Sequence, residues 1–188
     1  MDSFAYKYDI RTELLDGKIV AMASAGTNHN TVTLNIAMLF KAYLQGKPCK
    51  VFSEGADVYL TKKDRLVPDV MVVCNRDIIK PKGVFGAPDL VVEVLSNSTA
   101  KLDRGYKKDL YERSGVKEYW LVDTNNRSIE VHLLQDEKLK LDNVYTLLTD
   151  DYIEDMTDEE QADLVHEFKT SLFDDLVIKI EDVFDDMI

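Results

Sequence analysis

Two valine-rich apolar runs, each with a carboxylate at its start or inside it, constrain the fold of this chain more than any other feature. Asp69 opens one run and Glu93 lies inside the next. Their composition predicts two buried strands, at residues 67–74 and 88–96. An isolated ionised carboxylate among valines costs several kcal/mol unless a partner compensates its charge. Because we expect the two strands to be neighbours, we predict that the carboxylates share one partner, and a divalent metal ion is the simplest candidate.

The other patterns predict a mixed α/β fold, with a central mixed β-sheet flanked by helices. An Asp-Gly turn at Asp16 and Gly17 predicts a hairpin. Apolar residues at helical spacing predict a helix over about 28–44, and Asp103 is a good N-cap for a second helix over 103–114. We expect further strands at 50–53, 56–60, 117–122, 129–134 and 176–180, a basic loop at 75–87 and a short helix at 159–171.

The length of 188 residues favours one domain, 1–188, with an acidic C-terminal extension over about 150–188. The net charge of −12 is unevenly distributed. Residues 1–120 carry 18 Lys and Arg against 15 Asp and Glu, whereas residues 121–188 carry 5 against 20. The net charges are therefore +3 and −15, and the overall acidity is a poor guide to what the first part binds.

The N-terminus has no apolar signal core, and no apolar stretch approaches the roughly 18 residues of a membrane span. We therefore expect no membrane partner. Cys49 and Cys74 are too few for a disulfide framework, and we interpret both as small residues on buried strands. A reducing, cytoplasmic location is the default expectation.

Taken residue by residue, each candidate for chemistry has a structural alternative. Glu93 alternates onto the strand face of Val91 and Leu95, where a salt bridge to Lys or Arg would also explain it. Asp69 follows a proline and can be a strand-entry residue. Lys107 lies at the edge of the inward stripe of its helix, where an ordinary solvated lysine is the alternative. Glu13 by itself is typical of an exposed hairpin residue.

Together, these residues resemble the Uma-type restriction-endonuclease family, within the PD-(D/E)XK nuclease superfamily. The resemblance spans about residues 8–135 in the family's order, and residues 176–184 resemble its closing segment. The stretch around 150–166 has no match. The matching stretches are 13–17, the helix start at His29, 67–70, 88–96, 103–107, Tyr111 and 115–123.

The resemblance implies a restriction-endonuclease-like core with a metal-dependent phosphodiesterase site. Asp69 matches the aspartate of the motif and Glu93 its (D/E) position. The motif's lysine would stand at position 95, where this chain has Leu95, and Lys107 in the next helix matches the relocated lysine of this family. Glu13 matches an early acidic residue. His29 matches a recurring histidine whose role stays open.

The predicted function is an endonuclease that cleaves DNA, in double-stranded form, with Mg²⁺ or Mn²⁺ held by Asp69 and Glu93. Lys107 would orient or deprotonate the attacking water or stabilise charge. Glu13 would hold a water or a second ion. Two-strand cleavage often uses two active sites, which favours a C2 homodimer.

Two other functions remain open on the sequence. The first is a non-catalytic module of the same fold that binds nucleic acid or protein, favoured by the lack of an extensive basic surface. The basic clusters at 62–65, 76–82 and 101–108 are modest, but the last two flank the candidate site in sequence, which favours the nuclease. The second is a metal-dependent hydrolase for another phosphate substrate. The acidic stretch 150–160 is either a solvated face or a DNA mimic lying over the basic groups. We interpret His132 and His166 as structural or surface residues.

Overall fold

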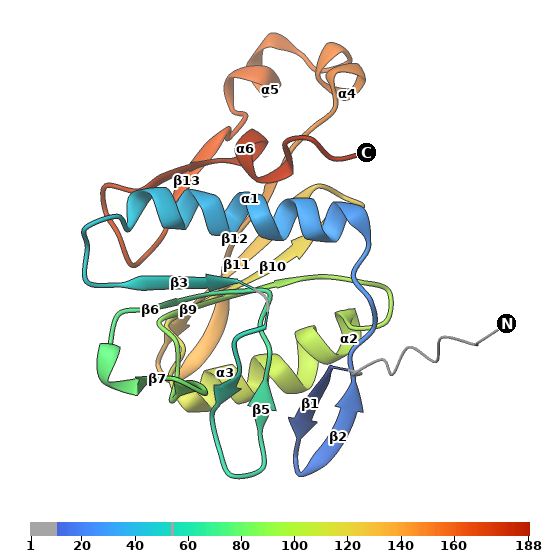
Figure 1. Cartoon of the computed structure of the whole chain (residues 1–188). Helices are drawn as coiled ribbons and strands as arrows, with labels where there is room; N and C mark the ends of the chain where they lie inside the picture. Colours follow the sequence, from blue (N-terminus) through green and yellow to red (C-terminus); the bar gives the residue numbers. More distant parts are fainter. Residues whose placement is uncertain (1–10, 54) are drawn as a thin grey trace, which may run out of the picture.

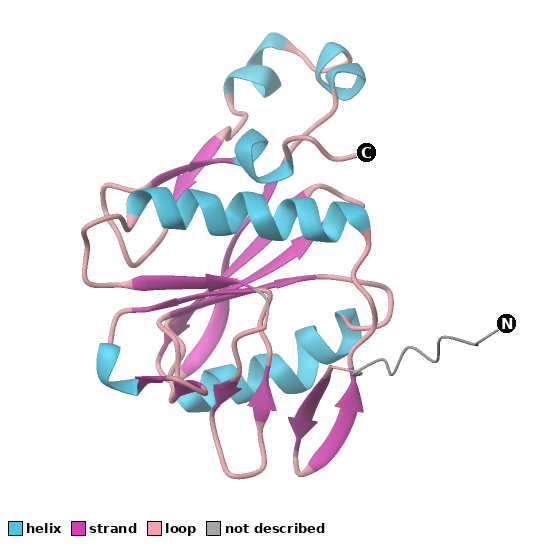
Figure 2. Ribbon diagram, in the orientation of Figure 1, coloured by secondary structure: helices cyan, strands magenta, loops and turns pink. Residues whose placement is uncertain are grey.

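A six-stranded mixed sheet forms the middle layer of the molecule, with helices on both faces (Figures 1 and 2). The computed structural model describes residues 11–53 and 55–188. The strand order is β12-β11-β10-β9-β6-β3, in which β9 and β10 run parallel and the other neighbours antiparallel. The predicted fold class is therefore confirmed. The strands are β3 (Lys50–Ser53), β6 (Val70–Val73), β9 (Leu90–Val94), β10 (Glu118–Asp123), β11 (Ser128–Gln135) and β12 (Lys138–Thr146).

Alternation along β9 divides the core between the two faces of this sheet. Val92 and Val94 pack with Trp120 on the face covered by helix α1. Val91 packs on the opposite face, where α3 lies. The first face also receives the C-terminal elements. The two helices are α1 (Thr27–Tyr43) and α3 (Lys108–Ser114), and the C-terminal elements are β13 (Glu167–Lys169), β14 (Val177–Lys179) and α6 (Ile180–Phe184).

A second sheet, in the order β2-β1-β5-β4-β8-β7, lies on the α3 side of the first. The Asp-Gly turn joins β1 to β2, and Asp16 and Gly17 have φ angles of 48° and 75°. These values match the tight hairpin turn that the sequence predicts. The strands are β1 (Thr12–Leu15), β2 (Lys18–Ala21), β4 (Val58–Tyr59), β5 (Arg65–Leu66), β7 (Ile79–Lys80) and β8 (Gly83–Phe85).

The second predicted helix begins earlier than expected, so the prediction of Asp103 as its N-cap is wrong. Helix α2 (Ala100–Leu102) runs into a π-helical stretch, Asp103–Lys107, and then into α3. Asp103 has helical angles (φ −67°, ψ −43°), and its N–H donates to the carbonyl of Thr99. The helix begins after Thr99 instead, and the hydroxyls of Ser96 and Thr99 lie 3.0 Å apart in the turn that precedes it. Gly115, with φ 89°, ends α3 as predicted.

Three further expectations need correction. The loop over 75–87 contains a 3₁₀ turn, Arg76–Ile78, together with β7 and β8. Strand β12 was not predicted at all. The helix expected over 159–171 is limited to α5 (Asp158–Ala162), which follows α4 (Asp150–Glu154). The residues after α5 form strand β13, in which Phe168 is buried and both its neighbours are exposed. Burial therefore alternates with the two-residue period of a strand, and Phe168 packs against Trp120 and Tyr145.

Cys49 and Cys74 form a disulfide bond, which corrects their interpretation as separate buried residues. Lys50 pairs with Val73 across β3 and β6, so the cysteines flank the adjacent position of the ladder. The two cysteines are 25 positions apart in the sequence, and the pairing of β3 with β6 brings them together. None of the helices in residues 11–53 and 55–188 has the length and apolar character needed to cross a lipid bilayer.

Candidate active site

The strand register brings Asp69 and Glu93 face to face. β6 and β9 are antiparallel neighbours with Val70 opposite Val92, so the next pair along the ladder is Asp69 and Glu93. The backbone N–H of Val94 donates to Asp69 Oδ2 at 2.7 Å. Both carboxylates line one cleft. The expectation that their strands are neighbours is therefore correct.

Glu93 is held from the α3 side. Its side chain is buried, and its Oε1 accepts hydrogen bonds from the Tyr111 hydroxyl at 2.8 Å and from Lys107 Nζ at 3.3 Å. Burial raises the pKa of Glu93 well above its usual range, and the positive charge of Lys107 opposes that rise. Burial and Lys107 thus act in opposite directions on the ionisation of Glu93.

Lys107 lies at the centre of an acidic cluster. It is only 4% exposed, which excludes an ordinary solvated lysine. Its Nζ lies 3.2 Å from Glu13 Oε1, 3.3 Å from Glu93 Oε1 and 3.3 Å from Asp103 Oδ1. Burial lowers the pKa of Lys107, but the three carboxylates raise it by more, so the net shift is upward. The group is therefore a permanent cation at neutral pH.

The π-helical stretch places Lys107 and Asp103 in this cluster. Both residues are buried within it. The wider turn of a π-helix releases backbone carbonyls from the usual ladder, and the Tyr119 hydroxyl donates to the carbonyl of Asp103 at 3.1 Å. Such turns occur frequently at functional sites.

Glu13 joins the site from β1. Its Oε1 accepts from the Val67 N–H at 3.0 Å, in the segment that leads from β5 to Asp69. Its 4% exposure excludes the exposed hairpin residue that local sequence favours. The reason is tertiary, because β1 pairs with β5 and turns this side chain inward.

Three more residues complete the surroundings. His29, in the first turn of α1, has its Nε2 3.4 Å from Asp69 Oδ2. Asp103 and Tyr111 are site residues to which the sequence pattern assigned no site role. Their spacing of four residues on either side of Lys107 predicts one shared helical side, but that spacing alone does not distinguish a site from an inward-facing stripe.

The carboxylates of Glu13, Asp69 and Glu93 are hydrogen-bonded in the same way. Each has one oxygen bound by donors of the protein. Their other oxygens, Oε2, Oδ1 and Oε2, accept no hydrogen bond from the residues that the structure describes. All three line a cleft of about 1030 Å³. Within the described ranges, no three His, Cys, Asp or Glu side chains already surround one metal-sized position.

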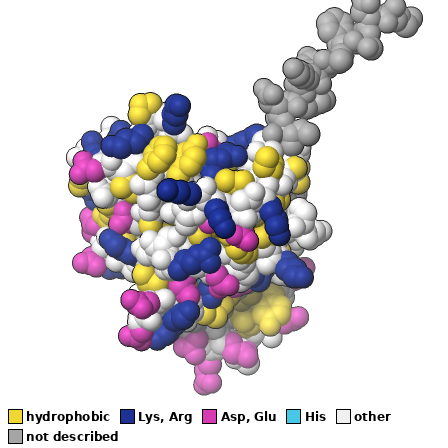
Figure 3. Space-filling model, turned by 90° about the horizontal axis from the view of Figure 1, so that it is seen from below, with side chains coloured by type: hydrophobic (Ala, Val, Ile, Leu, Met, Phe, Trp, Pro, Cys, Tyr) yellow, Lys and Arg dark blue, Asp and Glu magenta, His cyan; other side chains and the backbone are white. Residues whose placement is uncertain are grey.

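Away from the charged cluster, the walls of the cleft are uncharged. Hydroxyl and amide side chains from the start of α1, the loop after β9 and the turn after β10 line it, and Arg11 lies at its edge. The adjoining face of the molecule, seen from below in Figure 3, carries many Lys and Arg side chains. Asp and Glu lie mainly along the left and lower borders of that view.

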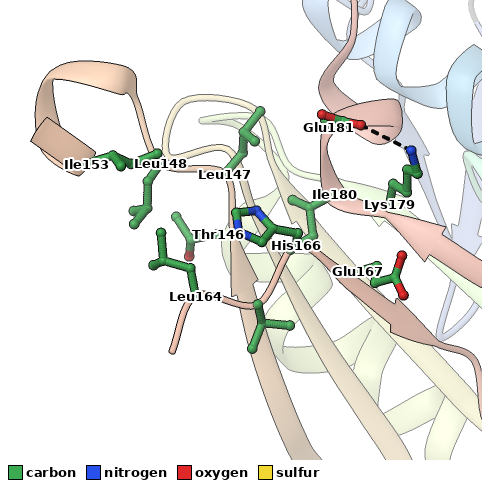
Figure 4. A pocket seen from close by; sticks show the side chains of 11 residues that line it. Thr146, Leu147, Leu148, Ile153, Leu164, His166, Glu167, Lys179, Ile180 and Glu181 are labelled. Atoms are coloured by element: carbon green, nitrogen blue, oxygen red, sulfur yellow. Dashed lines mark ion pairs between the residues drawn. The ribbon is translucent and has the colours of Figure 1, made fainter. Parts of the chain in front are cut away.

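A second pocket, of about 270 Å³, lies at the other end of the molecule beside the acidic extension. Apolar side chains such as Leu147, Ile153 and Leu164 surround His166 there, and Lys179 and Glu181 form an ion pair at the rim (Figure 4). None of the predicted site residues lines this pocket.

Helices α4 and α5 lie at the opposite end of the molecule from the β1–β2 and β4–β5 turns (Figure 1). The acidic stretch therefore does not cover the basic cluster at 62–65, and the conjecture of an internal DNA mimic loses its basis there. His132 is buried beside the ring of Tyr119, as the structural interpretation requires.

Comparison with known proteins identifies the family. Residues 3–161 match the Uma2 family, described as "Putative restriction endonuclease". The chain therefore belongs to the Uma2 family, as the resemblance predicts.

Two proteins of Synechocystis sp., named uncharacterized protein slr1290 and sll1609, are similar in sequence. The first is 32% identical over 127 residues, covering 66% of this chain and 67% of the relative. The second is 27% identical over 117 residues, covering 60% and 66%. The chain thus matches about two thirds of the length of each relative.

One solved structure has the same fold. It is described as "a putative nuclease belonging to DUF820 from Anabaena variabilis". The two structures superpose with a TM-score of 0.64 at 16% identity, covering 92% of this chain and 89% of the other. At this identity the likeness shows the fold alone.

Proposed function

We propose that this protein is a metal-dependent endonuclease that cleaves double-stranded DNA in the cleft of Asp69 and Glu93. The observation that carries the proposal is the arrangement of Glu13, Asp69 and Glu93 around Lys107. Each carboxylate is fixed through one oxygen and keeps the other without a protein donor in the described structure. Membership of the Uma2 family, described as "Putative restriction endonuclease", supports the same activity.

The donor set fits Mg²⁺ or Mn²⁺. Mg²⁺ is usually bound by one or two carboxylates, with substrate phosphates and waters in the other positions, rather than by a closed protein cage. Asp69 and Glu93 would hold the ion, and Glu13 a second ion or a water. A bound ion would supply Lewis-acid stabilisation of the phosphate charge and lower the pKa of a water molecule.

The protein's own groups position these oxygens. The Val94 N–H and His29 fix Asp69, while Tyr111 and Lys107 fix Glu93. Because Lys107 stays protonated, we assign it to stabilising negative charge and orienting water rather than to removing a proton.

The rival function is a non-catalytic binding module on the same fold. The observation in its favour is the lack of a preformed cluster of three metal-binding side chains in the described part of the chain. A buried lysine surrounded by three carboxylates is costly to maintain without a use, which favours the nuclease. The homodimer and the cytoplasmic location remain part of the proposal, and the disulfide is the observation against that location.

The test is the rate of plasmid cleavage in Mn²⁺ by wild type and by Glu13→Gln, Asp69→Asn, Glu93→Gln and Lys107→Met. We expect each of Asp69→Asn and Glu93→Gln to lose at least about 10²-fold in rate, the scale of losing one preorganised electrostatic group. Asp89→Asn is the matched control, since Asp89 follows a proline as Asp69 does but does not line the cleft. Wild-type rates in both site variants would refute the assignment.

A further inference from the structure

We propose that the tips of two adjacent hairpins, the turn 16–19 of β1–β2 and the turn 61–64 of β4–β5, bind the sugar–phosphate backbone of duplex DNA beside the cleft. We call these two turns the double tip. The inference rests on the proposed function for its occupant, but it concerns a different surface from the carboxylates.

The double tip is a fixed structure. The Gly17 N–H donates to the carbonyl of Lys63 at 2.9 Å, and the Asp16 N–H donates to Asp64 Oδ1 at 2.8 Å. Asp64 is buried and also accepts from the Thr61 and Tyr106 hydroxyls, at 2.5 and 2.6 Å. One carboxylate therefore joins both turns to the helix that carries Lys107. Side chains presented from such a base lose less entropy on binding than those of a mobile loop.

The double tip presents cations. Lys18 and Lys62 are exposed and form no ion pair with any residue in the described ranges. Lys63 is 73% exposed, and its Nζ is 4.0 Å from Asp16, the one exposed carboxylate in the two turns. Ile19, beside Lys18, is 76% exposed. Cations around an exposed aliphatic side chain match a nucleic-acid backbone, whose phosphates alternate with apolar sugar faces.

The same strand connects the double tip to the cleft. Val20 and Ala21 of β2 line the cleft, and Val20 pairs with Glu13. From Glu13 to Asp16 is three residues, or about 10 Å at a rise of about 3.4 Å per residue. The phosphates held by the double tip would therefore be neighbours of the reacting phosphate and not the reacting phosphate itself.

The main competing occupant is a second copy of the chain. All four residues of β2 are exposed, and the strand is an edge of its sheet, which makes it available for strand pairing. The three lysines oppose this pairing, because a two-fold contact would bring like charges together.

The experiment measures binding of a fluorescent 20-bp duplex as a function of salt, in Ca²⁺ in place of Mg²⁺ so that cleavage does not interfere. The variants are the triple Lys18→Ala/Lys62→Ala/Lys63→Ala, and Ile19→Ser. The matched control is the triple Lys140→Ala/Lys169→Ala/Lys179→Ala, which removes the same charge from β12, β13 and β14. Thermal unfolding and sedimentation verify the fold and the oligomeric state of each protein.

We expect the slope of log K against log salt to be about 2.7 units shallower in the double-tip triple, since each phosphate contact contributes about 0.9. Ile19→Ser should weaken binding several-fold with the slope unchanged, and the control triple should keep both. A double-tip triple with the wild-type slope overturns the inference even if wild type cleaves DNA. Conversion of a wild-type dimer to a monomer by Ile19→Ser, with DNA affinity unchanged, assigns the surface to a second copy and overturns it too. Loss of cleavage in the site variants alone tests the proposed function separately.

Discussion

At the scale of single residues, Lys107 determines whether the acidic cluster is compatible with folding. Glu13, Glu93 and Asp103 all lie within 3.3 Å of its ammonium group, and all four side chains are buried. Burial raises the pKa of Glu93 and of Asp103, and the lysine charge opposes both shifts. Removing the cation would leave buried carboxylates without compensation.

We expect Lys107→Met to lower the free energy of unfolding by about 3 to 5 kcal/mol at pH 8. A carboxyl group whose folded-state pKa is raised stabilises the fold below its unfolded value, about 4, and loses that contribution as pH rises through the folded value. The deficit should therefore shrink as pH falls from 8 toward 4. Urea unfolding across this range measures it.

Lys108→Met is the control for that prediction, because Lys108 is the next residue of the helix and makes no ion pair with the described residues. It should change the free energy of unfolding by no more than about 0.5 kcal/mol. A Lys107→Met deficit that stays constant from pH 8 to pH 4 would contradict the electrostatic explanation.

At the scale of elements, the strands that present the site carboxylates are held by their ladder and by a covalent bond. The disulfide joins the end of β6 to the start of β3, while Asp69 precedes the opposite end of β6. A link between residues 25 positions apart restricts the unfolded chain, and its effect on stability is calculable from the loop length.

The double variant Cys49→Ser/Cys74→Ser should lose about 3.5 kcal/mol of unfolding free energy, by the loop-entropy relation for about 25 residues. Treatment of the wild type with a reductant should produce a similar loss. The plasmid cleavage rate of the folded variant should stay within about twofold of wild type, because Asp69 is fixed by Val94 rather than by the bond. Equal stability with and without the disulfide would contradict this account.

Element by element, the sequence predicts structure where the signal is local. Residues 50–53 form β3 as predicted, the Asp16–Gly17 turn has its expected geometry, and the strands of Asp69 and Glu93 are neighbours. The N-cap at Asp103 was wrong because the helix already begins at Ala100, after Thr99, so Asp103 lies inside it. β13 was missed because its one buried side chain, Phe168, depends on packing far away in sequence.

The candidate site shows the same division. The sequence pattern indicated Asp69 and Glu93 as buried carboxylates and placed Lys107 at the edge of the inward stripe of its helix, whereas the site role of Glu13 came from the family resemblance. The burial of Glu13 depends on the pairing of β1 with β5, and that of Lys107 on a π-helical turn. Neither has a local signature. Tyr111 and Asp103 were missed as site residues because their contacts exist only once that turn has formed.

At the scale of the whole molecule, the acidic helices α4 and α5 are too far from the lysines of the double tip to affect them strongly. α4 and α5 lie at the far end from the double tip (Figure 1), and the Debye length is about 8 Å at physiological salt. The acidic extension should therefore have little effect on DNA binding. Deleting all of residues 150–188 is not the way to test this, because Phe168, Ile180 and Phe184 belong to the core.

We expect the quadruple variant Asp150→Asn/Asp151→Asn/Glu154→Gln/Glu159→Gln to bind the 20-bp duplex within about twofold of wild type at 150 mM salt. Glu160 is left in place because it forms the capping box of α5 with Thr157. Affinity more than about tenfold higher in the variant would restore the DNA-mimic conjecture.

The most direct test of the central claim is cleavage of supercoiled plasmid by wild-type protein in Mg²⁺, in Mn²⁺ and in EDTA, beside Asp69→Ala prepared identically. The account predicts nicked or linear plasmid with either metal, none in EDTA, and none from the variant under any condition. Equal cleavage in EDTA and Mg²⁺, or equal cleavage by Asp69→Ala and wild type, would contradict it. No cleavage by wild type with either metal would contradict it as well, and would favour the binding module.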